Sequence, residues 1–497
     1  MSLTYEYSKW SNIADYASYI VDRHFNASVL LGAYIEDPVK CEAFIRYCIN
    51  NGLAPDVYIS AIPHITGVVE QESTGNASKM LSVDFSGVRS GSGGTADYIG
   101  DMSQATLVNQ PKLLKYSGEK YYWGSGVMSN YCSATKSASI SNVFEVITKV
   151  NLVFPTGGNY CFLGSTNGGG IDIYITGNKY IHYELNNGVL DVNSGVAISY
   201  AENTDFWIKV IRDHTLVQFY TSHDGTTWTQ LGTDKTITDT ATEVQTLFTI
   251  GSYVSPIGGF MQNGRIYKYS ISDTIGGAPT VNFDFTNFNP AISETTWTAT
   301  TGETWTLNRP VTWDFNYRST IVTRTKLQQN TGYMESGSFV NTDYVSIFIL
   351  PTFFDTPTLG YYKALYTNND SESPLSGYLD NSLLYEASWA SNTLGIYTNG
   401  VLANISFPIN NKKVLLTATA RGMYPDPLKF QSNKNTIQTG INGTYSTPFK
   451  KLKTINNNYP SPVQNEPNMY IVLKGDNQSN DAFKDFLNTT IFNGEIY

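Results

Sequence analysis

From about residue 106 onward, apolar and polar residues alternate along short stretches that are separated by turn residues. In the stretch 143–154, Phe144 and Val146 fall on one face of an extended chain, while Glu145 and Lys149 fall on the other. Because successive side chains of a strand point to opposite faces, this is the pattern of a half-buried strand. Many such strands, with turns roughly every eight to twelve residues, predict an antiparallel sandwich or barrel.

Three stretches of this β-rich part occur a second time in the same order. The pairs are 170–178 with 394–400, 207–225 with 414–435, and 260–267 with 491–497. Repetition in a fixed order predicts a tandem duplication of one fold. On this alignment the second copy ends at Tyr497 and lacks the closing strand that Lys268–Ile271 provides in the first. An open strand edge is usually covered, so we expect a homo-oligomer or packing against another protein there.

The first hundred residues have a different pattern. Apolar residues at helical spacing predict a helix from about Lys9 to Phe25, and Asp37-Pro38 predicts the start of a second helix that ends at Asn50-Asn51-Gly52. The stretches 28–36 and 56–63 are interpreted as strands. We therefore expect a small α+β module over residues 1–83, followed by a Gly- and Ser-rich linker over residues 84–106.

Composition and charge exclude several classes of function. The net charge is −10 and only 15% of residues are charged, with no basic run, so binding to nucleic acid through its phosphates is not expected. No apolar stretch reaches the roughly 18 residues of a transmembrane helix, so membrane insertion is not expected either. The four cysteines show no metal or redox spacing and are predicted to be buried free thiols, consistent with synthesis in a reducing cytoplasm: Cys41, Cys48, Cys132 and Cys161.

Four stretches resemble those of a known family. They are Q-P-K-L-L-K-Y-S-G (110–118), Y-Y-W-G-S-G-V (121–127), N-G-R-I-Y-K-Y-S-I (263–271) and the tail V-N-F-D-F-T-N-F-N-P…T-G-E-T-W-T-L-N (281–308). Through them, residues 107–309 resemble a laminin-G-like, or concanavalin-A-like, jelly-roll domain of phage virion proteins, and residues 310–497 resemble it more faintly. The fold class expected is mainly β, with two tandem antiparallel jelly-roll sandwiches after the small α+β module.

The resemblance also implies a function. It indicates a non-enzymatic structural and adhesive component of a phage particle, such as a head or tail fibre, assembled in the cytoplasm of the bacterial host. The N-terminal module would anchor the chain to other virion proteins, and the jelly rolls would contact host surface glycans or neighbouring virion proteins. The alternatives are a glycan-degrading depolymerase and a free bacterial carbohydrate-binding lectin. The start of the chain lacks the order of a secretion signal, which argues against the secreted lectin.

Enzyme motifs are weak in this sequence. Glycan hydrolases of the concanavalin-like group carry E-x-D-x-E on one strand, and the nearest candidate here, Asp284, stands alone on its strand. The stretch S-H-D-G-T-T-W (222–228) resembles the repeated box of sialidases, but it occurs once and is one residue short. Arg212 and Arg265 are the nearby arginines. We therefore predict no catalytic residues and interpret 222–228 as a hairpin turn, with Trp228 in the core.

Metal and histidine candidates are interpreted as structural. The aspartates at predicted strand ends that could hold calcium are read as turn residues: Asp213, Asp224 and Asp234. His24 and His64 have neither metal spacing nor a Ser-His-Asp order around them, and structural roles are predicted for both. No metal, cofactor or specific ligand-binding residue is predicted.

Overall fold

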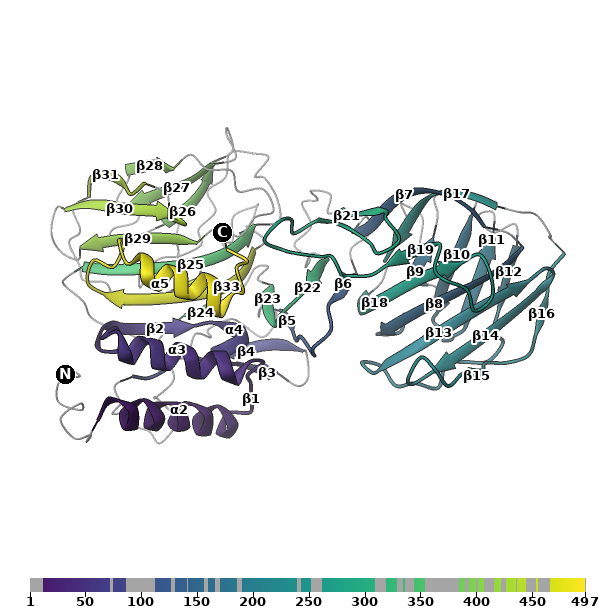
Figure 1. Ribbon diagram of the computed structural model, residues 1–497, viewed down its shortest axis with the longest axis horizontal. Helices are drawn as coiled ribbons and strands as arrows, with labels where there is room; N and C mark the ends of the chain where they lie inside the picture. The colour runs from purple at the N-terminus through teal and green to yellow at the C-terminus, as the bar shows by residue number, and fades with distance from the viewer. Residues whose placement is uncertain are drawn as a thin grey trace. The chain divides into compact units, whose positions relative to one another are not determined.

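The computed structural model divides the chain into two compact units. Unit 1 contains Met1–Ser117 and Arg324–Tyr497, and unit 2 contains Gly118–Thr323 (Figure 1). Unit 2 is therefore an insertion in unit 1. The residues that the structure describes are 12–71, 75–85, 112–126, 130–140, 142–155, 160–165, 170–185, 190–238, 243–251, 262–308, 319–328, 334–335, 344–353, 384–388, 393–398, 401–405, 415–421, 426–434, 436–443, 453–454 and 465–496.

Unit 2 is built from two antiparallel sheets. The first sheet has the order β12-β11-β10-β9-β17-β7-β21-β20. Its strands are β7 (Tyr131–Ile140), β9 (Tyr160–Ser165), β10 (Ile171–Thr176), β11 (Ile181–Leu185), β12 (Leu190–Asn193), β17 (Glu243–Ile250), β20 (Thr296–Thr298) and β21 (Thr304–Asn308).

The second sheet of unit 2 has the order β15-β14-β13-β8-β18-β6-β22, with β16 paired to β14 and β19 paired to β18. Its strands are β6 (Tyr121–Ser125), β8 (Val143–Asn151), β13 (Asp205–Asp213), β14 (Leu216–Ser222), β15 (Thr229–Gln230), β16 (Lys235–Thr236), β18 (Gln262–Ser272), β19 (Val281–Phe283) and β22 (Thr320–Val322). The alternation read along residues 143–154 is confirmed, since Phe144 and Val146 are buried in the core.

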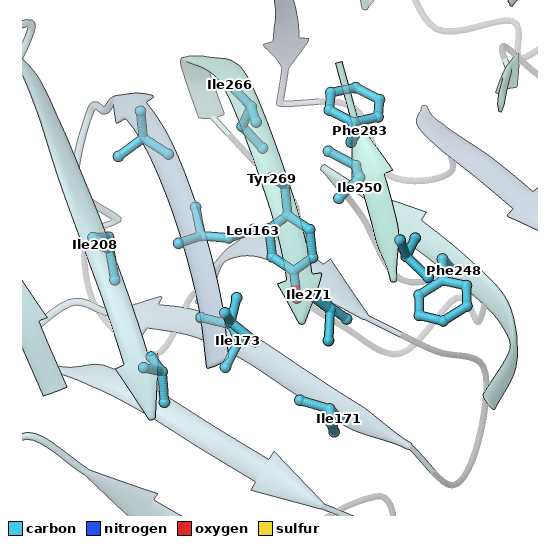
Figure 2. Close-up of a cluster of buried hydrophobic side chains, with 14 of the residues drawn as sticks. Leu163, Ile171, Ile173, Ile208, Phe248, Ile250, Ile266, Tyr269, Ile271 and Phe283 are labelled. Carbon is cyan, nitrogen blue, oxygen red and sulfur yellow. The ribbon is translucent and has the colours of Figure 1, made fainter. Parts of the chain in front are cut away.

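One hydrophobic core lies between the two sheets of unit 2. Figure 2 shows Ile171 and Ile173 of one sheet, and Ile208 and Ile271 of the other, converging on the same cluster. Trp305 is fully buried in the cluster, and its indole N–H donates to the carbonyl of Asn282 (2.9 Å). Burying each large apolar side chain of this kind stabilises a fold by about 1.5–3 kcal/mol. The expected class, a mainly β antiparallel sandwich with a small helical N-terminal part, is confirmed.

Unit 1 combines strands from both ends of the chain. A six-stranded sheet has the order β2-β33-β25-β29-β30-β31, and a five-stranded sheet has the order β1-β3-β4-β5-β23. The strands of the six-stranded sheet are β2 (Val57–Ala61), β25 (Tyr344–Phe353), β29 (Leu416–Arg421), β30 (Asp426–Ser432), β31 (Gln438–Gly443) and β33 (Asn465–Lys474). Those of the five-stranded sheet are β1 (Ala33–Tyr34), β3 (Val68–Gln71), β4 (Asn76–Met80), β5 (Lys112–Leu114) and β23 (Lys326–Gln328).

Smaller sheets and helices complete unit 1. A three-stranded sheet and a two-stranded sheet lie in its C-terminal part. Their strands are β26 (Leu384–Ser388), β27 (Thr393–Thr398) and β28 (Val401–Ile405), and β24 (Met334–Glu335) and β32 (Lys453–Thr454). The helical segments are α2 (Ile13–Leu30), α3 (Pro38–Asn50), η1 (Ala54–Asp56), α4 (Pro63–Thr66), α5 (Asp481–Phe486) and the turn η3 (Leu487–Ile491).

The two N-terminal helices are capped by side chains. The Asp37 carboxylate accepts a hydrogen bond from the backbone N–H of Lys40 (2.9 Å) at the start of α3, as the sequence predicted. The Asn12 side chain caps α2 in the same way. The expected end of this first helix near Phe25 is wrong, because the helix continues to Leu30 and ends before Gly32, which has φ +64°. The expected strand 28–36 is therefore reduced to Ala33–Tyr34.

The N-terminal segment shares its core with the C-terminal part of the chain. Buried residues of α2 and α3 pack in one cluster with Phe348 of β25, Ile471 of β33 and Phe483 of α5. Figure 1 shows α5 over β33 and β25, and the rings of Phe348 and Phe483 lie 5.4 Å apart. The expected domains were 1–83, 107–309 and 310–497. The structure divides the chain differently, because β2 and α3 share a core with elements that begin more than 200 residues later in the chain.

The beginning of the expected linker is part of the fold. Asp84 forms an ion pair with Arg23 of α2 (2.8 Å), and Phe85 is buried. Because of these contacts, the packed N-terminal segment extends beyond residue 83, where the expected module ended. Residues 86–106 of the expected linker lie outside the described residues.

The sheets of the two units support the duplication but correct its alignment. The order β14-β13-β8-β18-β6 of unit 2 corresponds to β30-β29-β25-β33-β2 of unit 1. The counterpart of β18 is therefore β33, and the match of 260–267 with 491–497 is wrong, because the described residues of the second stretch, 491–496, contain no strand. The closing strand is present, and its outer edge pairs with β2 of the same chain. The argument for an oligomer from an open edge does not hold.

Three of the four cysteines lie in these cores. Cys41, Cys48 and Cys132 are buried free thiols, as predicted, and burial raises the pKa of the Cys41 and Cys48 thiols. The side chain of Cys161 lies outside the described residues. In the part of the chain that the structure describes, no helix combines the length and apolar character needed to cross a membrane.

Candidate functional site

The turn after β14 is held by hydrogen bonds among its own residues. The Asp224 carboxylate accepts hydrogen bonds from the backbone N–H groups of Thr227 (2.7 Å) and Thr226 (2.8 Å). The Ser222 hydroxyl oxygen accepts from the backbone N–H groups of Asp224 (3.2 Å) and Gly225 (3.0 Å). Mainly through the bonds from Thr227 and Thr226, the pKa of Asp224 is held far below its ordinary value. Residues 222–228 therefore form a turn that is held by hydrogen bonds among its own residues, as its Asp-Gly pair predicted.

Gly225 is required at its position for two reasons. Its φ of +74° lies in the left-handed region that L side chains rarely adopt. A Cβ atom at this position would also lie 2.7 Å from the indole ring of Trp207 on β13. The turn therefore rests directly on the Trp207 ring, which holds residues 222–228 against the outer face of the sheet.

The outer face of this sheet, opposite the core, carries aromatic rings alternating with lysines. We call Trp207, Tyr220 and Trp228, together with Lys149 and Lys209, the aromatic face. The register places Trp207 opposite Lys149, and Lys209 opposite Tyr220. The Lys209 ammonium lies 4.4 Å from the Trp228 ring centroid and 5.2 Å from that of Tyr220. Cation–π contacts of this kind fix the rings in place while leaving them partly exposed.

Polar side chains border the aromatic face. The Asp234 carboxylate accepts hydrogen bonds from the side-chain amides of Gln218 (2.9 Å) and Gln230 (2.6 Å). The Lys209 ammonium lies 3.9 Å from the Glu145 carboxylate, so its charge is partly balanced. Oriented amides, a carboxylate and partly exposed rings form a surface that can contact both apolar and hydroxyl groups of a ligand.

The expected core position of Trp228 is wrong. Its side chain is partly exposed and lies on the aromatic face, against Lys209. The alternation along the chain breaks at the turn, so the sequence did not reveal the side to which this ring points.

The aspartates considered as calcium ligands do not share a site. Asp224 is engaged by its own turn, and Asp234 is engaged by the two glutamine amides. Asp213 lies at the exposed end of β13, 2.7 Å from the Nδ1 atom of His214. Among the residues that the structure describes, no group of His, Cys, Asp and Glu is arranged to hold a metal ion.

Asp284, the lone carboxylate of the hydrolase comparison, serves the sandwich. Its carboxylate accepts hydrogen bonds from the Thr300 hydroxyl (2.7 Å), the Asn282 amide (2.7 Å) and the backbone N–H of Thr286 (2.9 Å). Burial is the largest influence on its pKa and raises it, but the hydrogen bonds led by Thr300 outweigh burial and leave the pKa below its ordinary value. This carboxylate is held ionised within a structural network.

The two arginines that were considered as ligands for a sugar carboxylate have separate structural partners. Arg212 is buried and donates to the carbonyl of His214 (3.1 Å) and to the Tyr183 hydroxyl (3.2 Å). Arg265 stacks on the ring of Tyr121 with 4.9 Å to its centroid. Both therefore stabilise the sandwich through aromatic and backbone partners.

The two histidines of unit 1 are buried and bond to backbone carbonyls. The Nε2 atom of His24 lies 3.0 Å from the carbonyl oxygen of Thr66, and that of His64 lies 3.3 Å from that of Ile491. Burial lowers the pKa of His24 to about 4 and that of His64 to about 3. They stay neutral near pH 7 and have separate hydrogen-bond partners.

A second polar cluster lies on the other sheet of unit 2 and was not found in the sequence. On β10 and β11, the alternate residues Ile171, Ile173, Tyr183 and Leu185 point into the core, and on β12 Leu190 and Val192 pack against it. Their neighbours Asp172, Tyr174, His182, Glu184 and Asp191 therefore point to the outer face. These five residues, called the acidic row below, come from three strands, so a search along single strands could not bring them together.

Hydrogen bonds orient the side chains of the acidic row. The Asp191 carboxylate lies 2.8 Å from the Nδ1 atom of His182 and accepts a hydrogen bond from the Tyr174 hydroxyl (3.2 Å). The Tyr174 and His182 rings stack with centroids 4.7 Å apart. The pKa of Glu184 lies above its ordinary value, mainly because of burial. The hydrogen bond from Tyr174 is the next largest influence and lowers the pKa, and the nearby charge of Asp191 raises it.

No family model matches the sequence, and no curated protein matches it. Among solved structures, the chain is similar to domains LG4–5 of the mouse laminin alpha1 chain (11% identity, 75% of this chain and 95% of that one, TM-score 0.27). It is also similar to the exoplasmic/lumenal domain of VIP36 bound to Ca²⁺ and Man3GlcNAc (12%, 33% and 80%, TM-score 0.24). A third is a putative carbohydrate binding protein from Bacteroides ovatus (14%, 42% and 60%, TM-score 0.29).

Proposed function

We propose that the protein is a non-enzymatic, glycan-binding adhesive component of a phage particle. The observation that carries glycan binding is the aromatic face, where Trp228 and Tyr220 are partly exposed beside Lys209. A pyranose ring has an apolar C–H face, which packs on an aromatic ring, and a rim of hydroxyl groups, which accept and donate hydrogen bonds. The aromatic rings would pack against the apolar face of the sugar, and the side-chain amides of Gln218 and Gln230 would hydrogen-bond to its hydroxyl groups.

The rigid base of the aromatic face favours a binding role. The turn 222–228 is fixed by its own hydrogen bonds and by the contact of Gly225 with Trp207, so little conformational entropy is lost when a ligand binds. The carboxylates of the two weak enzyme motifs have structural partners, Asp284 in the sandwich and Asp224 in its turn. We therefore propose that glycan is bound without cleavage.

The location in a virion rests on the sequence resemblance of residues 107–309. The N-terminal segment is part of the core of unit 1, so unit 1 as a whole is the proposed anchor to other virion proteins, and unit 2 the proposed adhesive part. Immunogold labelling of purified particles tests the location. Labelling of a head or tail appendage supports it, and particles without label count against it.

Glycan binding is tested with the whole chain on immobilised bacterial surface glycans. Trp228→Ala should weaken binding roughly tenfold or more, as expected for an aromatic anchor. The matched control is Ile275→Ala, because Ile275 is also an exposed apolar residue of unit 2 (44%) but lies in a loop after β18. Equal binding by Trp228→Ala and the wild type would refute the site. Release of reducing sugar ends by the wild type would refute the non-enzymatic proposal.

A further inference from the structure

Two glutamine side chains at the border of the aromatic face are oriented by one carboxylate. Gln218 of β14 and Gln230 of β15 each donate a side-chain N–H to the Oδ1 atom of Asp234, over 2.9 Å and 2.6 Å. A carboxylate only accepts hydrogen bonds, so the nitrogen of each amide must face Asp234. The carbonyl oxygen of each amide therefore points away from Asp234 and is held in place as a hydrogen-bond acceptor.

These acceptors share one side of the sheet with the aromatic rings. Gln230 lies opposite Tyr220 in the register, and Gln218 is two residues from Tyr220 along β14, so both point to the side of the aromatic face. Gln230 and Asp234 are exposed, and Gln218 is partly exposed. A ligand that packs on the Trp228 ring can therefore reach them from solvent.

Asp234 carries its negative charge at neutral pH. The hydrogen bonds from Gln218 and Gln230 hold the pKa of its carboxyl group below the ordinary value. Burial, and after it the charge of Asp234, raises the pKa of Tyr220, so the Tyr220 hydroxyl group keeps its proton. The polar border thus presents a fixed negative charge and two oriented carbonyl oxygens.

The positive charges of the aromatic face are matched by carboxylates of the same sheet or of the chain beside it. The side chain of Lys209 is 15% exposed, and its ammonium group lies 3.9 Å from the carboxylate of Glu145. The side chain of Lys149 is 18% exposed and forms an ion pair with Glu119. These lysines are therefore poorly placed to bind an anionic ligand.

Two further lysines of unit 2 are directed or located away from the glutamines. Lys235 pairs with Val217, which faces the core, so its side chain points away from the aromatic face and its ammonium group lies beside Gly195. Lys268 of β18 is three strands from Tyr220, which is roughly 14 Å at about 4.8 Å per strand. Neither lysine is placed to balance an anionic group bound at the glutamines.

We propose that the aromatic face selects an uncharged glycan and rejects a glycan that carries carboxylate or sulfate groups. A sugar hydroxyl group can donate to the glutamine carbonyl oxygens and to Asp234, whereas an ionised carboxylate can only accept. An acidic sugar would lie beside the charge of Asp234 and leave the oriented acceptors unpaired, and both effects disfavour its binding. This inference rests on the proposed glycan-binding function and adds the class of glycan.

Paired probes test the selection on the whole chain. The probes are immobilised oligosaccharides of glucose, galactose or mannose, each beside a counterpart with its C6 hydroxymethyl groups oxidised to carboxylates. Ligands that lose roughly tenfold or more of their affinity in Trp228→Ala should be neutral, and their oxidised counterparts should bind the wild type roughly tenfold more weakly or less well still.

The outcomes separate this inference from the function on which it rests. If no probe depends on Trp228, both the glycan-binding function and the selection are refuted. If the oxidised counterparts bind through Trp228 as tightly as the neutral probes, glycan binding stands and the selection is overturned. An amino-sugar counterpart that binds more tightly than the neutral probe would also overturn it, because the charge of Asp234 rather than hydroxyl donation would then select the ligand.

Variants test the residues that are assigned to the selection. Asp234→Asn keeps an acceptor oxygen toward the glutamines but removes the charge, so the preference for neutral over oxidised probes should fall about threefold or more. Gln230→Leu removes one acceptor and should weaken neutral binding about two- to tenfold. The control Asp273→Asn removes an exposed carboxylate in the loop after β18 and should change neither value. An unchanged preference in Asp234→Asn would overturn the proposal, and because the preference is a ratio measured on one protein sample, it does not depend on the fraction that is folded.

Discussion

Acidification should destabilise unit 1 through its two buried histidines. Burial lowers the pKa of His24 to about 4 and that of His64 to about 3, from an ordinary value of 6.5. In His24 the buried Nδ1 atom has no hydrogen-bond partner, so a proton there would be poorly solvated. Near His64, the charges of Arg324 and Lys40 oppose a further positive charge on the imidazole ring, and that of Glu495 favours it.

The magnitude follows from proton linkage. Both histidines are neutral in the folded chain, and the unfolded chain takes up protons as the pH falls through 6.5, so stability is full above that value and falls below it. At about pH 5, which is 1.5 units below 6.5 and still above both folded pKa values, each histidine should cost about 2 kcal/mol, at 1.36 kcal/mol per unit. Together they cost about 4 kcal/mol, a large part of the 5–15 kcal/mol that stabilises a typical protein.

Carboxyl groups of unit 1 act in the opposite direction. Burial raises the pKa of Glu36 and Asp56, and a raised carboxyl pKa adds stability as the pH falls. This gain begins as the pH falls through the raised pKa of each carboxyl group and is complete below its ordinary value, so it reduces the loss that the histidines cause.

Hydrogen exchange assigns the effect to its unit. The free energy of opening, measured at about pH 7.5 and pH 5 on peptides from α2 and α3, should fall by up to about 4 kcal/mol, less the gain from the two carboxyl groups. His24→Gln, which keeps a donor toward Thr66, should lose about half of this pH dependence. Peptides from β13 and β14 of unit 2 serve as the internal control. A change of less than about 1 kcal/mol in α2 and α3, or a pH dependence unaltered by His24→Gln, would refute the reasoning.

Two further predictions concern unit 2. Gly225→Ala should lower its free energy of unfolding in urea by about 2–4 kcal/mol, since it adds a clash with Trp207 to the strain of a positive φ. The control Gly276→Ala, at φ +73° in open space, should cost about 1 kcal/mol. Equal losses from the two variants would contradict the contact with Trp207. Residues 118–323, expressed alone, should unfold in one cooperative calorimetric transition. The reason is that β6 and β22, at the two ends of this segment, pair with each other, and that the hydrophobic core of unit 2 is formed by its own residues. A fragment without such a transition would show that unit 2 depends on unit 1.

Much of the local structure follows from the sequence. The Asp37-Pro38 cap, the half-buried strand that begins at residue 143 and the turn at Asp224-Gly225 were all predicted where the structure has them. These features depend on residues within a few positions of one another, because capping, alternation and turn chemistry act over one or two turns of helix or neighbouring residues of a strand.

The alignment of the two copies shows where local patterns mislead. The short similarity of 260–267 and 491–497 predicted a strand in the second stretch, but its described residues, 491–496, contain no strand. A few matching residues carry no information about pairing partners. The true counterpart, β33, was recognisable only from its place between β25 and β2 in the sheet.

Tertiary structure alone decided the units and the sites. The pairing of β2 with β33 joins residues about 400 positions apart, and it depends on the shared core of α3, β25 and α5 rather than on any local signal. The position of Trp228 depends on how its turn packs on Trp207, and the acidic row depends on the register of three strands. The sequence determines which side chains share the face of a strand, because that period is local, whereas register and sheet order follow from packing across the whole chain.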